Sequence, residues 1–222
     1  MIYIIDHQDS FTWNVVHQFS KFEEVYCSNY FEISQKKLDQ SNTIVLSSGP
    51  GSPKDYPFTS KIYKKYKGKK KLIGICLGYQ QILFNEKGKI VQQKNIYHGY
   101  QSTVKVTKES KLFKENKKFK VGRYHSLKLF EPYNSNSIKI SMRCDKTNIP
   151  MGIEDFKNKV FGFQFHPESF LTENGNIIIR SILNFKKISE ISAASGVVLD
   201  SSPKKEFNEN FIKAKSLLEL YK

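Results

Sequence analysis

The sequence predicts an α/β protein in which helices cover both faces of a sheet. Short apolar segments alternate along the chain with longer segments whose apolar residues recur at helical spacing. Two of the apolar segments lead directly into glycine-containing loops, at residues 47–51 and 74–78, as strands do when they end in a turn. The 222 residues have the length expected of one domain with a full core, since domains run to roughly 100 to 200 residues.

The first half of the chain is expected to alternate strands and helices in regular order. The segment at the N-terminus is short and apolar and has no basic leader, which favours a strand over a signal peptide. The apolar runs predict strands and the amphipathic or basic stretches between them predict helices. These elements are expected at residues 1–5 (strand), 11–22 (helix), 43–46 (strand), 61–67 (helix), 72–75 (strand) and 77–84 (helix).

The second half begins with a different pattern. Between residues 91 and 140 apolar and polar residues alternate, as in Thr-Val-Lys-Val at 103–106, which predicts hairpins or meandering strands. Residues 160–165 predict a last apolar strand. Thr172 is expected to be the N-cap of a helix that runs through Phe185.

The tail predicts a linker and a separate helix. Residues 188–202 are rich in Ser and Ala and have no apolar period, so residues 1–187 are expected to form the domain and 188–202 a linker. Within residues 203–222 a narrow apolar stripe recurs at four- and three-residue spacing, which predicts an amphipathic helix. This stripe is expected to pack either against the chain's own domain or against a partner. The stripe comprises Phe207, Phe211, Ala214, Leu218 and Tyr221.

A cysteine follows one of the apolar runs in the setting of a nucleophile. Cys76 lies between Gly74 and Gly78, directly after the strand expected at residues 72–75. A sharp strand-to-helix turn exposes such a side chain above a sheet, and a side chain at either flanking position would crowd the turn. Cys76 is the candidate nucleophile, although a lone cysteine in an apolar strand is more often a packing residue.

A histidine and a carboxylate follow the last predicted strand at a spacing that suits a general base. His166 and Glu168 are two residues apart, so on an extended segment their side chains leave the same face. Glu168 can then orient the imidazole of His166, as the carboxylate of a triad does. A neighbouring imidazole and the N-terminus of the following helix would together activate the Cys76 thiol.

Composition excludes several classes. Three cysteines, Cys27, Cys76 and Cys144, are too few and too scattered for a disulfide framework or a zinc site, and a cytoplasmic protein is expected. No segment approaches the ~18 apolar residues of a membrane span. The formal charge of +15 is carried mainly by lysine, whereas base readers and phosphate clamps draw on arginine. We therefore expect neither a membrane nor a nucleic acid as partner.

These segments, with Ser-Gly-Pro-Gly-Ser-Pro at residues 48–53, resemble the class I (triad) glutamine amidotransferases, whose cysteine attacks the amide carbon of glutamine and releases ammonia. Two more segments are similar to the glutaminase subunits of anthranilate synthase and aminodeoxychorismate synthase. They are Asp-Ser-Phe-Thr at residues 9–12 with Asn14, and Arg-Tyr-His-Ser-Leu at residues 123–127. Related subunits that serve guanylate, cytidylate or carbamoyl phosphate synthesis lack this pair. The resemblance runs from Met1 to about Phe185.

The resemblance implies a mixed, mostly parallel central sheet with a nucleophile elbow. It implies L-glutamine as substrate, a chorismate-using synthase as the partner in a hetero-oligomer, and no metal or organic cofactor. It assigns Cys76, His166 and Glu168 to the triad and the backbone amides of Gly51 and Leu77 to an oxyanion hole. The residues that it implies for glutamine binding are Gly49, Pro50, Gly51, Gln80 and the backbone of Ser126 and Leu127. His125 is expected to hold its loop rather than to take part in the chemistry.

The chain departs from the family pattern in two loops. His98-Gly99-Tyr100 stands where relatives commonly carry His-Gly-Lys, and His7-Gln8 replaces the more usual Asn-Tyr. Neither change touches the triad, but both bear on which synthase is served. The product, anthranilate or aminodeoxychorismate, is left open. Three alternative functions are also left open: a glutaminase without a synthase, an amidotransferase for another acceptor, and a catalytically silent regulatory subunit. The intact triad argues against the last of these.

Overall fold

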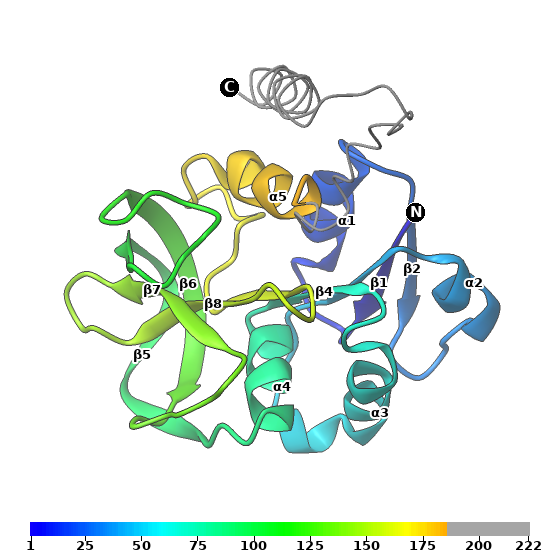
Figure 1. Cartoon of the computed structure of the whole chain (residues 1–222), viewed down its shortest axis with the longest axis horizontal. Coiled ribbons are helices and arrows are strands. Elements are labelled where there is room, and N and C mark those ends of the chain that lie inside the picture. The colour runs from blue at the N-terminus through cyan, green and yellow to red at the C-terminus, as the bar shows by residue number, and fades with distance from the viewer. Residues whose placement is uncertain (186–222) are drawn as a thin grey trace, which may run out of the picture. The chain divides into compact units, whose positions relative to one another are not determined.

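A computed structural model of the chain describes residues 1–185 (Figure 1). The linker expected at residues 188–202 and the helix expected at 203–222 lie outside the described residues. The strands are β1 (Ile2–Asp6), β2 (Val25–Asn29), β3 (Thr43–Leu46), β4 (Lys71–Ile75), β5 (Ile90–Val106), β6 (Lys118–Leu129), β7 (Lys139–Cys144), β8 (Pro150–Asp155) and β9 (Val160–Phe163). The helices are α1 (Thr12–Ser20), α2 (Gln35–Gln40), α3 (Pro57–Tyr66), α4 (Leu77–Asn85) and α5 (Gly175–Leu183), with a 3₁₀ turn at Pro53–Asp55.

In the described residues the strands form one 9-stranded sheet with the order β2-β1-β3-β4-β9-β8-β7-β5-β6. The pairs from β2 to β9 are parallel, and the pairs from β9 to β6 are antiparallel. The predicted α/β class with a mixed sheet is confirmed. We refer below to the strands β2, β1, β3, β4 and β9 as the parallel half and to β8, β7, β5 and β6 as the antiparallel half.

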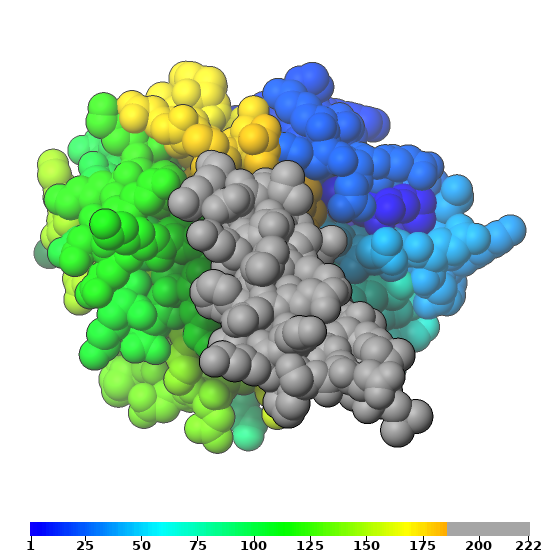
Figure 2. All heavy atoms as spheres, turned by 45° about the horizontal axis from the view of Figure 1, so that its top comes forward, coloured from blue at the N-terminus to red at the C-terminus, as the bar shows by residue number. Residues whose placement is uncertain are grey.

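Helices cover both faces of the parallel half because its strands are apolar on both sides. In β1, Ile2 and Ile4 pack in one buried cluster with side chains of α1 and α5, whereas Tyr3 and Ile5 pack in another with side chains of α2, α3 and α4. Figure 1 shows α1 and α5 on one side of the sheet and α3 and α4 on the other. In the space-filling view, α5 (orange) lies beside the blue N-terminal segment that contains α1 (Figure 2).

The antiparallel half is built on the long hairpin of β5 and β6. Its pairing runs from Ile90 opposite Leu129 to Lys105 opposite Lys118, with irregularities between Gln92 and Tyr97 and after His98. β7 joins β5 to β8, which then pairs with β9. The alternating pattern at residues 91–140 therefore marks strands as expected.

Most predicted elements occur within a few residues of their expected bounds, but several differ. Thr172 is not an N-cap: Asn174 occupies that position, and the Thr172 hydroxyl accepts a hydrogen bond from the Gly122 N–H and donates to the His166 carbonyl oxygen. α3 begins at Pro57, four residues before the helix expected there, because proline suits the first helical turn. The strands β2 and β8, most of β7 and the helix α2 were not anticipated. No helix in residues 1–185 is both long and apolar enough to cross a membrane.

Candidate active site

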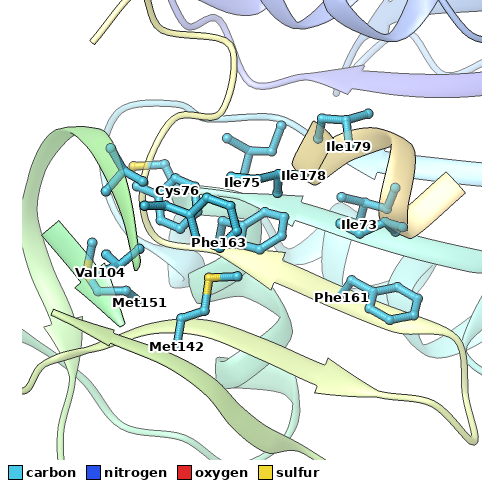
Figure 3. Close-up of a cluster of buried hydrophobic side chains, with 14 of the residues drawn as sticks. Ile73, Ile75, Cys76, Val104, Met142, Met151, Phe161, Phe163, Ile178 and Ile179 are labelled. Carbon is cyan, nitrogen blue, oxygen red and sulfur yellow. The ribbon is translucent and has the colours of Figure 1, made fainter. Parts of the chain in front are cut away.

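The turn between β4 and α4 holds Cys76 in a strained backbone conformation. Its φ is 51° and its ψ is −99°, a positive φ that residues with a side chain rarely adopt. Its N–H donates to the Phe163 carbonyl oxygen at 2.7 Å, which ties the turn to β9. In Figure 3 the sulfur of Cys76 lies at the margin of the buried cluster that contains Ile75 and Phe163. The strand-to-helix elbow is therefore present at Cys76.

Glycine is required on both sides of this elbow because backbones meet there. A Cβ added to Gly74 would lie 2.5 Å from the carbonyl carbon of Gly78. A Cβ added to Gly78 would lie 2.1 Å from the carbonyl oxygen of Leu46 on the neighbouring strand β3. The expectation that a side chain at either flank would crowd the turn is confirmed by these distances.

His166 and Glu168 form a buried pair after β9. Nδ1 of His166 lies 2.7 Å from Oε1 of Glu168, and their side chains are 2% and 0% exposed. The His166 N–H donates to the Gly122 carbonyl oxygen on β6 at 3.0 Å, which anchors the segment to the antiparallel half. Nε2 of His166 has no hydrogen-bond partner in the described residues. The ring is thus oriented by Glu168 through one nitrogen and leaves the other available.

The electrostatics of this pair favour the imidazolium. Burial opposes the charge on His166, but the negative charge of Glu168 and the thiol sulfur of Cys76 outweigh it, so the pKa of His166 lies well above its ordinary value. The arrangement can therefore supply a proton donor next to the Cys76 sulfur.

Two aromatic rings enclose His166 and explain one of the N-terminal signatures. Phe11 lies 5.3 Å and Tyr124 5.0 Å from the imidazole, measured between ring centroids. Oδ1 of Asp9 accepts from the Phe11 N–H at 2.7 Å and so orders the turn that presents Phe11. The segment at residues 9–12 thus shapes the wall of the site rather than its reacting groups.

Gln164 was not anticipated, yet its side chain contacts the candidate nucleophile. Its Nε2 lies 3.7 Å from Sγ of Cys76, and its Oε1 accepts from Nε2 of Gln80 at 3.0 Å. Gln80 is therefore on the Cys76 side of α4, as its spacing indicated, with its amide bonded to Gln164. The signal was available in the sequence, because Gln164 is two residues before His166 on an extended segment and shares its face.

The glycine-containing loop after β3 lies against the start of α4. A Cβ added to Gly49 would lie 2.8 Å from Cδ2 of Leu77, so the loop and the elbow are in close contact. The Tyr56 hydroxyl donates to the Pro50 carbonyl oxygen at 2.9 Å, and Gly51 has a φ of 73°. As the first residue of α4, Leu77 has an N–H without an acceptor inside the helix.

A buried histidine contacts the residue that leads from β3 into this loop. His7 is 0% exposed; its Nε2 lies 3.0 Å from the Thr59 hydroxyl and its Nδ1 3.2 Å from the Ser47 carbonyl oxygen. Burial lowers the pKa of His7 to about 4, so the ring is neutral at pH 7. The departure from the usual Asn at this position therefore places a neutral imidazole under the strand end that leads into the loop.

The remaining predicted residues, Ser126 and Leu127, are on β6. His125 is buried, and its Nδ1 lies 2.8 Å from the Leu127 carbonyl oxygen while its Nε2 accepts from Nε of Arg123 at 3.0 Å. His125 thus holds this segment, as expected. In residues 1–185 neither Ser126 nor Leu127 has a hydrogen bond to Cys76 or His166. The structure brings Cys76, Gln80 and Gln164 into contact, and it places the His166–Glu168 pair next to the Cys76 sulfur.

A groove of about 500 Å³ lies behind Glu168, between α1 and the start of α5. Its lining includes Glu168, Gln18, Phe170 and Ile177. Phe170 is 88% exposed, and Trp13 on the neighbouring α1 is 74% exposed. Large exposed aromatic side chains beside a groove are typical of surfaces that contact another protein.

Comparison with known proteins agrees with this geometry. The family described as glutamine amidotransferase class-I matches residues 3–185, and the family described as chorismate binding enzyme matches residues 173–219. Two structures have similar folds: a protein of Thermoplasma acidophilum (TM-score 0.71, 20% identity, 82% of this chain and 91% of that one) and a glutamine amidotransferase of Thermotoga maritima (TM-score 0.58, 18% identity, 75% of each).

Curated relatives are similar over most of the chain. Anthranilate synthase component 2 of Lactococcus lactis is 32% identical over 83% of this chain and 94% of its own length. Aminodeoxychorismate synthase component 2 of Klebsiella aerogenes is 30% identical over 83% of this chain and 100% of its own length. The bifunctional protein TrpGD of Thermotoga maritima is 36% identical over 85% of this chain, which spans 34% of that protein.

Proposed function

The chain belongs to the class I glutamine amidotransferase family, and from this premise we propose that it hydrolyses L-glutamine to glutamate and ammonia for a chorismate-using synthase. The observation that carries the proposal is the elbow at Cys76 together with the buried His166–Glu168 pair. The elbow places a sulfur where a strand ends and a helix begins. The pair supplies an oriented imidazole that can move a proton.

In the proposed first half-reaction the Cys76 sulfur attacks the amide carbon of glutamine. The C–S bond forms as the C=O electron pair moves to oxygen, and the backbone N–H groups of Gly51 and Leu77 donate to this oxyanion. Loss of such a donor costs about 2.7 to 4 kcal/mol in other enzymes. The intermediate then collapses: the C–N bond breaks as His166 gives its proton to the amide nitrogen, which leaves as ammonia.

The second half-reaction regenerates the sulfur. A water molecule, whose proton passes to His166, attacks the carbonyl carbon of the γ-glutamyl thioester; the C–O bond forms, the C–S bond breaks with its electron pair returning to the Cys76 sulfur, and glutamate is released. Glu168 keeps the ring in the orientation that both transfers need, since its 2.7 Å contact to Nδ1 is made by a side chain with no exposure. Gln164 donates to the sulfur at 3.7 Å and is suited to hold it in place while Gln80 meets the substrate.

The class of acceptor is supported by two independent similarities. The relatives from Lactococcus lactis and Klebsiella aerogenes are components of anthranilate synthase and of aminodeoxychorismate synthase. The match of residues 173–219 to the chorismate binding enzyme family points to the same acceptor. A synthase that covers the groove behind Glu168 would bury the exposed side chains of Trp13 and Phe170.

The test separates glutamine chemistry from the synthase reaction. Cys76→Ser should abolish synthesis from glutamine and chorismate by the complex with its synthase, while synthesis from added ammonium and chorismate continues. Cys27→Ser, a change on β2 away from the site, is the matched control and should leave both activities in place. Near-normal glutamine hydrolysis by Cys76→Ser would overturn the triad, and an inactive wild type would favour a silent regulatory subunit.

The product identifies the partner. The wild-type complex is given glutamine and chorismate, and its products are separated and identified by mass. Anthranilate indicates one synthase and aminodeoxychorismate the other, and both together indicate one glutaminase that serves two. Ammonia release without any aminated chorismate would instead favour another acceptor or a glutaminase that acts alone.

A further inference from the structure

A second cavity, outside the proposed triad, is lined by the antiparallel half. It has a volume of about 230 Å³ and lies between β5, β6 and the turn that follows β7. Cations and hydroxyl groups predominate among its lining side chains, and none of the described carboxylates is among them. The residues used below are Tyr97, Ser102, Lys120, Arg123, Lys146 and Thr147.

Arg123 lines this cavity with a guanidinium that is not paired. The residue is 0% exposed, and in the described part of the chain it has no ion pair with an acidic side chain. Nε donates to His125, and Nη1 makes only long contacts, at 3.4 Å to the Ser102 hydroxyl and 3.6 Å to the Cys144 sulfur. Nη2 has no hydrogen-bond partner within residues 1–185.

A buried guanidinium in this state is unusual, because buried charges are normally neutralised by a partner that also accepts their hydrogen bonds. Desolvation lowers the pKa of Arg123, because burial destabilises the charged form of the guanidinium. The face of the guanidinium is covered by the Tyr97 ring, whose centroid is 3.6 Å from Cζ. Stacking stabilises the cation but supplies no acceptor for its N–H groups. An acceptor is therefore missing on the Nη2 edge.

The rest of the lining suits an anion. Lys146 is exposed, and the side chain of Lys120 is 57% exposed and pairs at 3.1 Å with Glu173. The Ser102 and Thr147 hydroxyls can donate to an oxygen acceptor. Guanidinium N–H groups match the geometry of carboxylate and phosphate oxygens in pairs.

We propose that this cavity is an anion site that takes a small oxyanion, a phosphate or a carboxylate, with Arg123 as its buried counter-ion. Lys146 and the hydroxyls complete the coordination at the rim. The occupant satisfies Nη2 and replaces the long contacts of Nη1. The site is separate from the groove behind Glu168, with which it shares no lining residue.

The experiment measures binding to the full chain and does not depend on catalysis. Inorganic phosphate, malonate and chloride are titrated at constant ionic strength, and the midpoint of thermal unfolding is followed. We expect a saturable rise with phosphate or malonate and none with chloride. A response to phosphate alone identifies a phosphate site, a response to malonate alone a carboxylate site, and a response to both a site for either group.

The controls separate this site from the general positive charge of +15. Lys146→Gln should weaken the apparent affinity at least fivefold, and Arg123→Gln should abolish the saturable response. Lys36→Gln removes one equally exposed charge on α2, at the far end of the sheet, and should change nothing. If Arg123→Gln does not fold, the anion titrations of Arg123→Lys and Lys146→Gln still decide whether the proposal holds. Equal responses in Lys146→Gln, Lys36→Gln and the wild type, or an unsaturable response, would overturn the proposal.

Discussion

The parallel and antiparallel halves of the sheet bury different kinds of side chain. In β1, β3, β4 and β9 the buried side chains are mostly Ile, Val, Leu, Phe and Tyr, whereas the antiparallel half also buries Arg123, His125, Ser141 and Glu154. The parallel half positions Cys76 through close backbone packing at Gly74 and Gly78. The antiparallel half positions its groups through hydrogen bonds, such as those of Glu154 to the Ser110 hydroxyl and the Lys111 N–H. In the parallel half, an added atom at these glycines would collide with neighbouring backbone. In the antiparallel half, loss of one hydrogen-bond partner would leave a buried polar group unpaired.

The largest effect is expected where the two halves meet, at His166, which follows β9 and bonds to Gly122 on β6. His166→Ala removes the proton carrier and should lower kcat for glutamine hydrolysis by roughly 10² to 10⁴. Glu168→Gln keeps the shape of the side chain and should cost less. Steady-state ammonia release measures both. Equal and trivial losses would remove both residues from the mechanism.

A pair of glycine substitutions compares the two halves directly. Gly78→Ala puts a methyl group 2.1 Å from the Leu46 carbonyl oxygen, so we expect it to lower the free energy of unfolding by about 3 kcal/mol, the cost of overpacking. Gly99→Ala on β5 meets only the Tyr124 ring at 3.7 Å, and its φ of 72° should cost about 1 kcal/mol. Urea unfolding of both variants measures the difference. If Gly99→Ala lowered the free energy of unfolding as much as Gly78→Ala, the proposed difference between the two halves would be wrong.

Each half also buries a neutral histidine. Because of these two histidines, we expect the free energy of unfolding to be lower in acid. Burial lowers the pKa of His7 to about 4 and, together with the Arg123 charge, lowers that of His125 to about 3, from an ordinary 6.5. The unfolded chain therefore binds more protons below pH 6.5, and the free energy of unfolding falls as the pH drops from 6.5 towards 4. Each ring contributes on the order of 3 kcal/mol to this fall.

His7→Asn should remove its share of the acid loss. The measurement is the free energy of unfolding at pH 7 and at pH 4.5, from denaturant titrations of the variant and the wild type. His17→Asn, which removes an exposed ring on α1, is the control and should keep the wild-type slope. A slope for His7→Asn that matches the wild type would show that another group causes the acid loss.

The smallest effect is expected from Arg123, which reaches the glutamine chemistry only through other residues. It donates to His125, which bonds to the Leu127 carbonyl oxygen, beside the backbone proposed to bind glutamine. Arg123→Lys keeps the charge but loses the Nε bond, so we expect KM for glutamine to rise a few-fold with kcat nearly unchanged. Initial rates over a range of glutamine concentrations test this. A fall in kcat with an unchanged KM would place Arg123 in another role.

The residues that a local pattern could identify are those whose geometry is local. Cys76 with its two glycines occupies one turn, and His166 and Glu168 lie two residues apart on one extended segment, so spacing alone predicts their neighbours. Thr172 had the right side chain for an N-cap. Its hydroxyl instead bonds to Gly122 and His166, and a bond to a strand 50 residues away leaves no local trace.

The sequence by itself determined the α/β class, the order of most strands and helices, the elbow and the His166–Glu168 pair, because periodicity and short spacings follow from backbone geometry. Only the tertiary structure decided that Gln164 contacts Cys76, that β8 joins the two halves of the sheet, and that Arg123 is buried with no acidic partner among residues 1–185. These facts depend on strands that are far apart in the chain. Which side chains meet across a sheet is set by strand order and register, and neither is written in a local pattern.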